Sequence, residues 1–280
     1  MRKALRRAAA GLGVLAVLAG CAPRGLRVLA PFELKYKGRP GDSYSYSLAQ
    51  VFRGTVVNYG MPQLVVLKIR AMMSERVEEV ADSGWRRVRQ SSSLEPLEIN
   101  GIRVEPKGIP PLMETEIMRS PAGDVVPIEA GDPSSDMMIW AARSLGSTFP
   151  LLPPAPVRPG EKWRREQKIA VGESGEFQVV TIGELVRVEE AGAGRVAVIR
   201  MEGGVNLAEP FEADGVLMEA FRLEYNGLVR FDLDAGRIID SKQEGSLQMK
   251  GSFNKSSMEA RLSFTSGLAL EGAEGRGGRS

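Results

Sequence analysis

Apolar and polar residues alternate with a period of two along most of the chain after residue 31. Between residues 32 and 37, for example, apolar and charged side chains alternate one for one. Stretches with the same β-rich character lie at 63–80, 177–190, 196–201 and 247–264. Alternation of this kind is typical of an antiparallel sheet with one face in water. The pattern therefore predicts a mainly β fold.

Turn signals separate these stretches. Asn100-Gly101 and Asn226-Gly227 each lie between short segments that contain β-forming residues. Asn-Gly suits a type I′ hairpin turn, because both central residues need a positive φ. Further turn candidates lie at 82–84, 122–123, 193–194 and 235–236. The chain should run back and forth as one long antiparallel sheet, curved into an open half-barrel or a clam-like shape.

One segment has the period of a helix instead. Asp132 is a good N-cap, Pro133 suits the first helical position and Gly146 ends the pattern. One face of this predicted helix, residues 133–146, carries Met137, Trp140, Ala141 and Leu145. We expect a single short helix in the middle of the chain.

The order of the turn signals is repeated. Residues 39–44 (Arg-Pro-Gly-Asp-Ser-Tyr) parallel residues 158–163 (Arg-Pro-Gly-Glu-Lys-Trp), and the two Asn-Gly pairs follow in the same order. A fixed order of similar signals indicates a duplication. It predicts two similar halves, about 32–130 and 150–265, joined by the helix. The alternative is that unrelated hairpins reuse the same turn chemistry.

The N-terminus has the character of a targeting signal. Four basic residues (Arg2, Lys3, Arg6 and Arg7) precede an uncharged, mostly apolar run at 8–19. A membrane-spanning helix needs about 20 apolar residues, so this run fits the core of a signal peptide better. Residues 1–20 are therefore expected to be removed.

Leu18-Ala19-Gly20-Cys21 resembles the lipobox of bacterial lipoproteins. The resemblance implies diacylglycerol on the Cys21 sulfur, cleavage before Cys21 and a fatty acyl group such as palmitate on the new amino group. Two or more acyl chains attach a protein stably to a membrane. Ala22 is not the aspartate that marks inner-membrane retention, which points to the outer membrane, facing the periplasm. The alternative is an ordinary signal peptide and a buried thiol.

The expected mature chain has three parts. Residues 21–31 form a lipidated tether, whose ten residues after Cys21 reach at most about 35 Å. Residues 32–270 form a single β-rich domain. Residues 271–280 are rich in glycine and are expected to be disordered.

Charge and composition exclude several classes of function. The precursor has 37 Lys and Arg against 35 Asp and Glu; loss of the four basic signal residues leaves 33 against 35, a net charge of −2. This balance gives no reason to expect a nucleic-acid partner. The chain has no histidine, and its one cysteine is Cys21. A Ser-His-Asp or Cys-His site and a His/Cys zinc site are thereby excluded.

We therefore expect no enzyme, no metal site and no cofactor apart from the covalent diacylglycerol and fatty acyl groups. Asp232-Leu233-Asp234 begins like a calcium loop, but a hairpin turn is the preferred interpretation. Glu75, Glu78 and Glu79 are interpreted as a solvated strand face. Glu184, which interrupts an apolar row, is the best candidate for a partly buried carboxylate.

A ligand cavity is the remaining candidate site. Methionine side chains fill irregular apolar space and adaptable binding cavities. The helix could close the mouth of the curved sheet and line such a cavity. Its expected lining is Met137, Trp140, Ala141 and Leu145 with Met72 and Met73 of the sheet. The alternative is simple core packing.

A second resemblance covers the stretch 149–163, with Phe149-Pro150-Leu151-Leu152-Pro153 followed by Val157-Arg158-Pro159-Gly160-Glu161-Lys162-Trp163. It resembles uncharacterised, β-rich bacterial envelope lipoproteins, and the resemblance implies an envelope location and a β-rich fold without catalytic residues. A long meander with one helix is more distantly similar to the half-barrels of periplasmic lipid and lipoprotein carriers. The methionine content, the helix and the tether motivate our first hypothesis, an anchored, non-enzymatic lipoprotein that binds a lipid or another apolar ligand. The alternative is a structural lipoprotein with a filled core that binds an envelope protein.

Attachment through Cys21 leads to a first prediction. Cys21→Ser should abolish incorporation of radiolabelled fatty acid, because the sulfur that accepts the diacylglycerol is lost, and should leave the β-rich domain folded. Labelling of the variant would contradict the lipobox interpretation.

Overall fold

The computed structural model describes residues of two compact units, 1–30 and 31–280. The described residues are 30–105, 112–128, 149–171, 175–191, 194–213, 216–253 and 256–274. All strands belong to the second unit, and within the described ranges no helix has the length and apolar character needed to cross a membrane.

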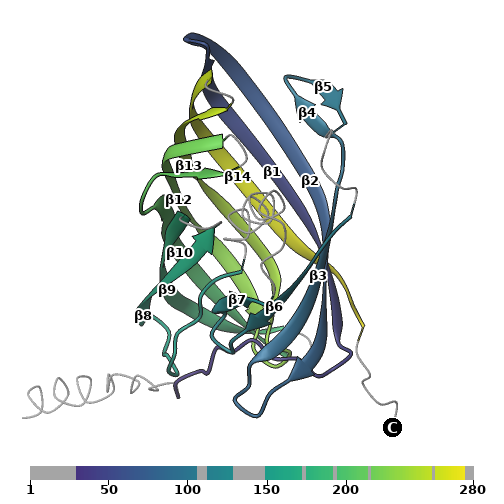
Figure 1. The fold of residues 1–280 in the computed structure, drawn as a ribbon. Coiled ribbons are helices and arrows are strands. Elements are labelled where there is room, and N and C mark those ends of the chain that lie inside the picture. Colours follow the sequence, from purple (N-terminus) through teal and green to yellow (C-terminus); the bar gives the residue numbers. More distant parts are fainter. Residues whose placement is uncertain are drawn as a thin grey trace, which may run out of the picture. The chain divides into compact units, whose positions relative to one another are not determined.

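The described part of the second unit forms one antiparallel sheet of 14 strands (Figure 1). The strands are β1 (Ser43–Asn58), β2 (Met61–Val80), β3 (Arg86–Leu94), β4 (Leu97–Ile99), β5 (Ile102–Val104), β6 (Met113–Arg119), β7 (Val125–Pro127), β8 (Lys162–Val171), β9 (Gly175–Ala191), β10 (Gly194–Leu207), β11 (Phe211–Ala213), β12 (Val216–Asp232), β13 (Arg237–Phe253) and β14 (Ser256–Glu274).

The strand order shows two meanders that meet in the middle of the sheet. It runs β7-β6-β3-β2-β1-β14-β13-β12-β10-β9-β8, with β4, β5 and β11 off this path. The first meander leads from β1 outward to β7, and the second leads from β8 at the opposite edge back to β14. The first and last strands of the chain therefore pair, from Ser43 opposite Glu274 to Asn58 opposite Met258.

The two edges of the sheet are linked by side chains and not by a backbone ladder. The Arg165 guanidinium of β8 lies 2.5 Å from the Asp124 carboxylate, next to β7. The Gln167 amide donates to the carbonyl of Val125 at 2.7 Å. The sheet is open in its backbone hydrogen bonding, and polar side chains hold its edges together at this level.

One face of the sheet carries the buried core, and we call it the inner face. On β1 the alternate residues Tyr44, Tyr46, Leu48, Gln50 and Phe52 are buried, while the odd-numbered residues between them reach solvent to varying degrees. The equivalent positions of β12, β10 and β14 belong to the same core. The alternation of buried and exposed positions explains the period of two in the sequence.

Residues 32–37, predicted as a strand, belong to none of the strands of the sheet, and Phe32 makes an isolated bridge with Val157, which also lies outside the strands. Their alternation has another cause, since Leu34 and Tyr36 insert into the core. Tyr36 meets the ring of Phe231 edge-on, with 5.5 Å between ring centroids, and its backbone NH donates to the Pro121 carbonyl. The segment therefore acts as a cover for one end of the core.

Glycines on the inner face make room for aromatic rings. A methyl group added at Gly183 would lie 2.2 Å from ring atoms of Trp163, its partner on β8. At Gly203 the nearest atom would be the Tyr225 hydroxyl, at 2.5 Å. The rings therefore lie along the backbone of the neighbouring strand, where any larger residue would collide with them.

Of the two hairpin turns predicted at Asn-Gly pairs, the structure confirms one and contradicts the other. Asn100 and Gly101 have φ of 51° and 86° and connect β4 to β5, so the predicted hairpin is confirmed. The hairpin predicted at Asn226-Gly227 is wrong, because both residues lie inside β12. A methyl group at Gly227 would lie 2.1 Å from the Lys242 carbonyl oxygen, so this glycine allows close strand approach.

The two Arg-Pro-Gly segments form matching turns. Gly41 and Gly160 have φ of 93° and 87°. Their NH groups donate to Val77 and Leu185, on the second strand of each meander, at 2.8 and 2.7 Å. Because the Asn-Gly parallel fails, the duplication as a whole stays a prediction.

A mainly β fold in one open antiparallel sheet is confirmed, with two boundary corrections. The strand candidate 247–264 spans two strands, β13 and β14, because the connection between them carries no glycine or proline in the sequence. The tail predicted from residue 271 is wrong up to Glu274, since β14 pairs with β1 to that point. The helix predicted at 133–146 lies outside the described residues.

The glycine contacts predict a sharp difference between two substitutions. Gly183→Ala should destabilise the domain by about 1–3 kcal/mol, because the methyl group overlaps the Trp163 ring. Gly267→Ala on the outer face, where the added methyl group would lie 3.9 Å from the Ser241 carbonyl oxygen, should change stability by less than about 0.5 kcal/mol. Urea unfolding of both variants measures the difference, and equal effects would contradict the packing described.

Candidate functional site

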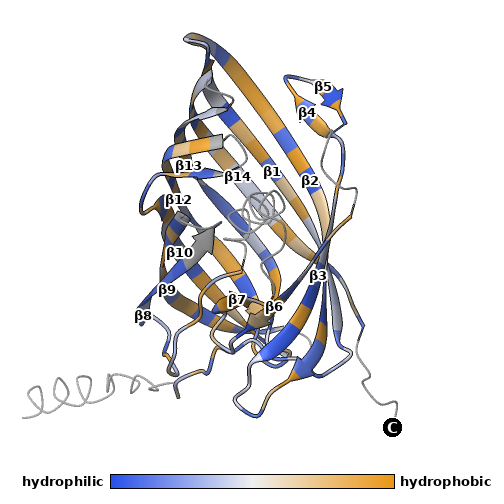
Figure 2. Cartoon of the chain, viewed as in Figure 1, coloured by the Kyte–Doolittle hydropathy of each residue, from blue (hydrophilic) through white to orange (hydrophobic). Residues whose placement is uncertain are grey.

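The inner face is an apolar wall whose exposure changes along the strands. Its central part is almost completely buried, as at Leu185, Ile199 and Val229. Toward the end where β1 turns into β2, partly buried residues lie among buried ones such as Phe177, Leu223 and Ala260. The partly buried residues at this end are Leu67, Ile69, Val179, Leu207, Leu247, Met249 and Leu262. Figure 2 shows a mostly hydrophobic upper end of β2 and mixed colouring lower down. We call this end the upper wall.

A row of polar side chains crosses the inner face at the level of the upper wall. Gln50 of β1 pairs in register with Ser266 of β14, which in turn pairs with Gln243 of β13. The Gln50 amide donates to the Ser266 hydroxyl at 3.3 Å. Both glutamines are buried, with exposed fractions of 4% and 6%. We call these three residues the polar row.

The polar row contains a buried acceptor without a partner in the described part of the chain. The Gln50 side-chain carbonyl, Oε1, accepts no hydrogen bond there. On the same inner face it is flanked by Leu48 and Phe52 along β1 and by Ile69 across β2. An unpaired acceptor in apolar surroundings costs roughly 1–3 kcal/mol. The carbonyl is therefore a point on the inner face where a hydrogen-bond donor would be stabilising.

The lower end of the inner face holds a buried ion pair. The Arg119 guanidinium of β6 binds the Glu75 carboxylate of β2 through two hydrogen bonds, of 2.6 and 2.9 Å. The Gln90 amide donates to the same carboxylate at 2.5 Å. Both charged side chains are about 95% buried. Burial alone raises the pKa of Glu75, but the charge and hydrogen bonds of Arg119 hold it below its usual value of 4.5.

Aromatic rings and a second arginine enclose this ion pair. The Arg119 guanidinium lies 4.7 Å from the ring centroid of Phe149 and 5.5 Å from that of Tyr36. Arg86 donates to the Lys37 carbonyl at 2.7 Å. Burial, reinforced by the charge of Arg119, lowers the pKa of Arg86 to about 10. Burial also raises the pKa of Tyr36.

The cavity beside the ion pair has a volume of about 10 Å³, which is room for a single water molecule. The side chains around it are therefore closely packed. This cluster fills the lower end of the core, and its close packing indicates that it stabilises the fold. A larger groove of about 410 Å³ lies among Val51, Arg53, Glu244 and Thr265, and its mixed polar lining differs from the apolar cavity expected.

The predicted cavity residues divide between the two faces. Met72 and Met73 are consecutive on β2 and therefore point to opposite faces. Met72 is 41% exposed on the outer face, whereas Met73 packs against the core. They cannot line one cavity together. Met137, Trp140, Ala141, Leu145 and the lipidation residue Cys21 lie outside the described residues.

The acidic candidates also lie in different surroundings. The interpretation of Glu75 as part of a solvated face is wrong, since Arg119 compensates its burial on the inner face. Glu184 bonds to Arg200 at 2.8 Å beside an irregularity in the β9–β10 register, so an ion pair and a bulge both accompany it. Asp232 accepts hydrogen bonds from the NH groups of Asp234 and Ala235, which confirms the predicted turn.

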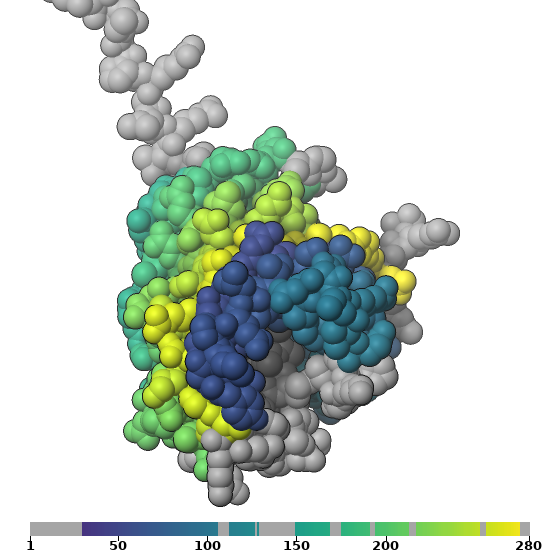
Figure 3. All heavy atoms as spheres, turned by 90° about the horizontal axis from the view of Figure 1, so that it is seen from above, coloured from purple at the N-terminus to yellow at the C-terminus, as the bar shows by residue number. Residues whose placement is uncertain are grey.

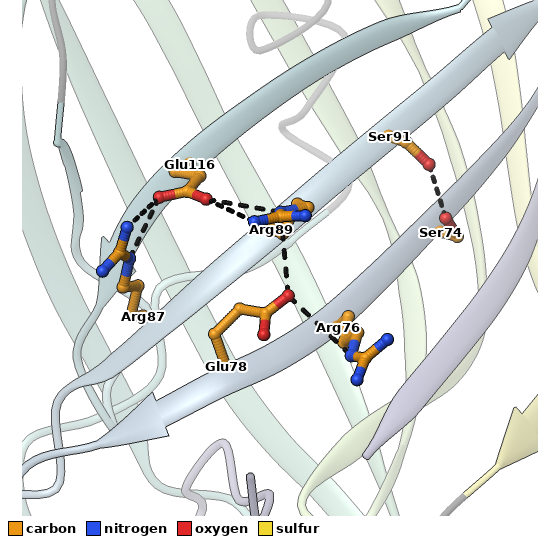
Figure 4. A network of polar contacts seen from close by, with 7 residues as sticks. All are labelled: Ser74, Arg76, Glu78, Arg87, Arg89, Ser91 and Glu116. Atoms are coloured by element: carbon orange, nitrogen blue, oxygen red, sulfur yellow. Dashed lines mark hydrogen bonds and ion pairs between the residues drawn. The ribbon is translucent and has the colours of Figure 1, made fainter. Parts of the chain in front are cut away.

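The outer face of the first meander carries a network of charged side chains (Figure 4). Glu116 of β6 binds Arg87 and Arg89 of β3, at 2.5 and 3.0 Å. Arg89 also lies 3.6 Å from Glu78 of β2. The network is solvent-exposed and alternates in sign, so it keeps this face wet. Among the described residues, no group of three or more acidic, cysteine or histidine side chains could hold a metal ion.

The sequence could not have revealed the polar row or the ion pair. Gln50 and Ser266 are separated by 216 positions, and Glu75 and Arg119 by 44. The one available signal was a glutamine in an otherwise apolar alternation, Leu48-Gln50-Phe52. Such a signal marks a buried polar residue but not its partners.

Comparisons with known proteins give structural matches of low score. No protein family and no curated relative matches the sequence. A lipovitellin studied for its lipid–protein interactions matches with a TM-score of 0.39 at 12% identity; the match covers 87% of this chain and 26% of the lipovitellin chain.

Two bacterial structures match over most of both chains. A putative exported protein with a YmcC-like fold from Bacteroides fragilis has a TM-score of 0.31 at 10% identity, covering 88% of this chain and 100% of the other. An outer membrane channel from Pseudomonas putida F1 has a TM-score of 0.25 at 6% identity, covering 86% and 99%. These scores lie below the level of a shared fold, so function is inferred from this chain's own geometry.

The buried ion pair predicts a specific acid sensitivity. Because the folded-state pKa of Glu75 lies below 4.5, its stabilising effect is present above pH 4.5 and is lost as the pH falls through the lowered value. Glu75→Gln should reduce this pH dependence of the unfolding free energy. It should also cost about 3–5 kcal/mol near neutral pH, since Arg119 is left buried without its partner.

Urea unfolding between pH 3 and pH 7, a range set by the usual carboxyl pKa, measures both effects. Glu78→Gln on the outer face is the matched control and should cost less than about 1 kcal/mol. An equal cost for the two variants would contradict the structural role of the ion pair.

Proposed function

We propose that this chain is a membrane-anchored lipoprotein of the bacterial envelope that binds a lipid or another apolar ligand on the upper wall and catalyses no reaction. The observation that carries the proposal is the unpartnered carbonyl of Gln50, buried within an apolar wall. The lipobox-like sequence around Cys21 supports membrane attachment.

The chemistry of the wall defines the expected ligand. Partly buried side chains such as Leu67, Leu247 and Leu262 offer apolar surface for an acyl chain or a similar group. Gln50 supplies a hydrogen-bond acceptor beside them, so a hydroxyl, amide or ammonium group of the ligand satisfies it. An amphipathic lipid combines both properties.

The close packing at the lower end favours a second candidate, a structural lipoprotein with a filled core that binds an envelope protein. The cavity of about 10 Å³ beside Glu75 and Arg119 is the specific observation behind it. The two candidates differ in the upper wall, which binds a ligand in the first and only packs in the second.

Mass spectrometry of organic extracts tests the first candidate. The mature chain, produced with Cys21→Ser to remove the covalent lipid, should release a bound lipid in a fixed ratio to protein. It should also enhance the fluorescence of an apolar probe. Repeated absence of both signals would contradict ligand binding and favour the filled core.

Substitutions on opposite faces of β13 locate the binding surface. Leu247→Gln on the inner face should lower ligand content and probe binding by about tenfold, because it places a polar group against the ligand. Ser246→Gln, one residue away on the outer face, should leave both unchanged. Circular dichroism confirms folding of both variants, and equal binding by the two folded variants would refute a site on the upper wall.

A further inference from the structure

The tip of the β1–β2 hairpin projects large apolar side chains into solvent. Tyr59, Met61 and Leu64 have exposed fractions of 70%, 60% and 81%. Among the described strands, β2 pairs at this level only with β1, since β4 begins to pair at Leu67 and β3 at Ala71. Within the described ranges, the tip of β2 therefore has a neighbouring strand on one side only.

A neighbouring hairpin extends this apolar surface. The Asn100 side chain, in the turn between β4 and β5, accepts from the Val66 NH at 2.7 Å and donates to the Leu64 carbonyl at 3.1 Å. These hydrogen bonds hold the β4–β5 hairpin beside the β1–β2 tip. The hairpin adds Ile102, which is 67% exposed, to the apolar surface. Figure 3 shows the two hairpins, in dark blue and teal, next to each other at this end.

Charged residues are excluded from the tip but not from its base. Every residue from 54 to 67 is uncharged, between Arg53 and Lys68. The nearest charges in register are Glu259 opposite Val57 and Arg261 opposite Thr55, on β14. The β1–β2 tip is thus apolar, with charged residues one or two positions below it, and the neighbouring hairpin adds the exposed Arg103 next to Ile102.

The turn at the tip holds its aromatic residue in an unfavourable backbone conformation. Tyr59 and Gly60 have φ of 52° and 72°, the signs of a type I′ turn. The equivalent position of the β4–β5 turn is Asn100, with φ of 51°, and asparagine tolerates this region far better than tyrosine does. Strain retained at an exposed position is a mark of function, and here it presents a tyrosine ring to the surroundings.

We propose that this hairpin tip inserts into the interfacial layer of a lipid bilayer. Tyr59, Met61, Leu64 and Ile102 together expose roughly 500 Å², when the 150–250 Å² typical of an aromatic side chain is taken as an upper guide for each. A stable protein interface needs about 800 Å² on each partner, so the tip is too small for a protein and convex enough to enter lipid. Tyrosine is enriched at membrane–water interfaces.

The inference rests on the proposed function in one respect, the attachment of Cys21 to a membrane, which brings the tip within reach of lipid when the strands lie along the membrane surface. The tether spans at most about 35 Å, and β1 alone is about 50 Å long at 3.4 Å per residue. Residues 31–42, at the start of the second unit, lie at the opposite end of the sheet from the tip (Figure 1). Anchor and tip would then hold the domain to a membrane at two separate points.

A single fluorescent label tests insertion directly. Because Cys21 is the only cysteine, the mature chain with Cys21→Ser and Leu64→Cys carries one thiol, which is labelled with an environment-sensitive nitrobenzoxadiazole dye. Vesicles of phosphatidylethanolamine and phosphatidylglycerol should shift its emission to the blue, and spin-labelled lipid should quench it. The same dye at Thr265→Cys, exposed on the outer face, should respond to neither.

A second variant separates insertion from folding. Tyr59→Asn should weaken vesicle co-sedimentation by about tenfold through loss of the ring, while its thermal midpoint stays equal or rises because asparagine relieves the strained turn. Unchanged vesicle binding by Tyr59→Asn, or a label at residue 64 that ignores vesicles, would overturn the proposal. So would a label that responds to solubilised envelope proteins and not to lipid.

The outcome is separable from that of ligand binding. A chain that releases bound lipid but whose tip ignores vesicles refutes only the insertion. A chain whose tip enters vesicles but that carries no ligand refutes only the binding site on the upper wall.

Discussion

The ladder between β1 and β14 is the constraint on which the rest of the sheet depends. It joins the two meanders, and with it the register of β1 decides which residues of the second meander share its face. A slip by one residue would turn the core side chains of one meander toward solvent. The same register places Ser266 opposite Gln50 and Phe264 opposite Phe52. The core and the polar row therefore follow from one pairing.

Close strand contacts make the inner face smooth enough to be a wall. Trp163 lies over Gly183, and the Tyr225 hydroxyl lies over Gly203 and near the Thr181 hydroxyl, at 3.2 Å. Because these rings lie along the strands, they cover the backbone and project only a little from the face of the sheet. The lower end is closed by segments 32–37 and 149–152 with the Glu75–Arg119 pair. Further apolar surface can be covered at the partly buried residues of the upper wall, such as Leu67 and Leu262.

Much of the fold could be predicted from local sequence, because antiparallel strands with one wet face alternate visibly. The segment 63–80 corresponds to β2 within two residues, and Asn100-Gly101 forms the expected turn. The hairpin predicted at Asn226-Gly227 was wrong, because in the sequence a glycine that allows close approach of a neighbouring strand cannot be told from a glycine in a turn. The site was less predictable. Partners such as Gln50 and Ser266 meet only through register, which no local pattern encodes, and alternation alone already separates Met72 from Met73.

The meeting of the first and last strands also sets the order of assembly. Residues 43–58 must wait for residues 256–274 before the inner face is continuous, so nearly the whole chain must be present before the sheet can close. Contacts of such sequence separation make folding slow, since the entropy of closing a long loop is lost before the contacts form. Until then the apolar wall has an unpaired edge on β1. Such an edge exposes unpaired backbone groups beside apolar side chains until β14 arrives.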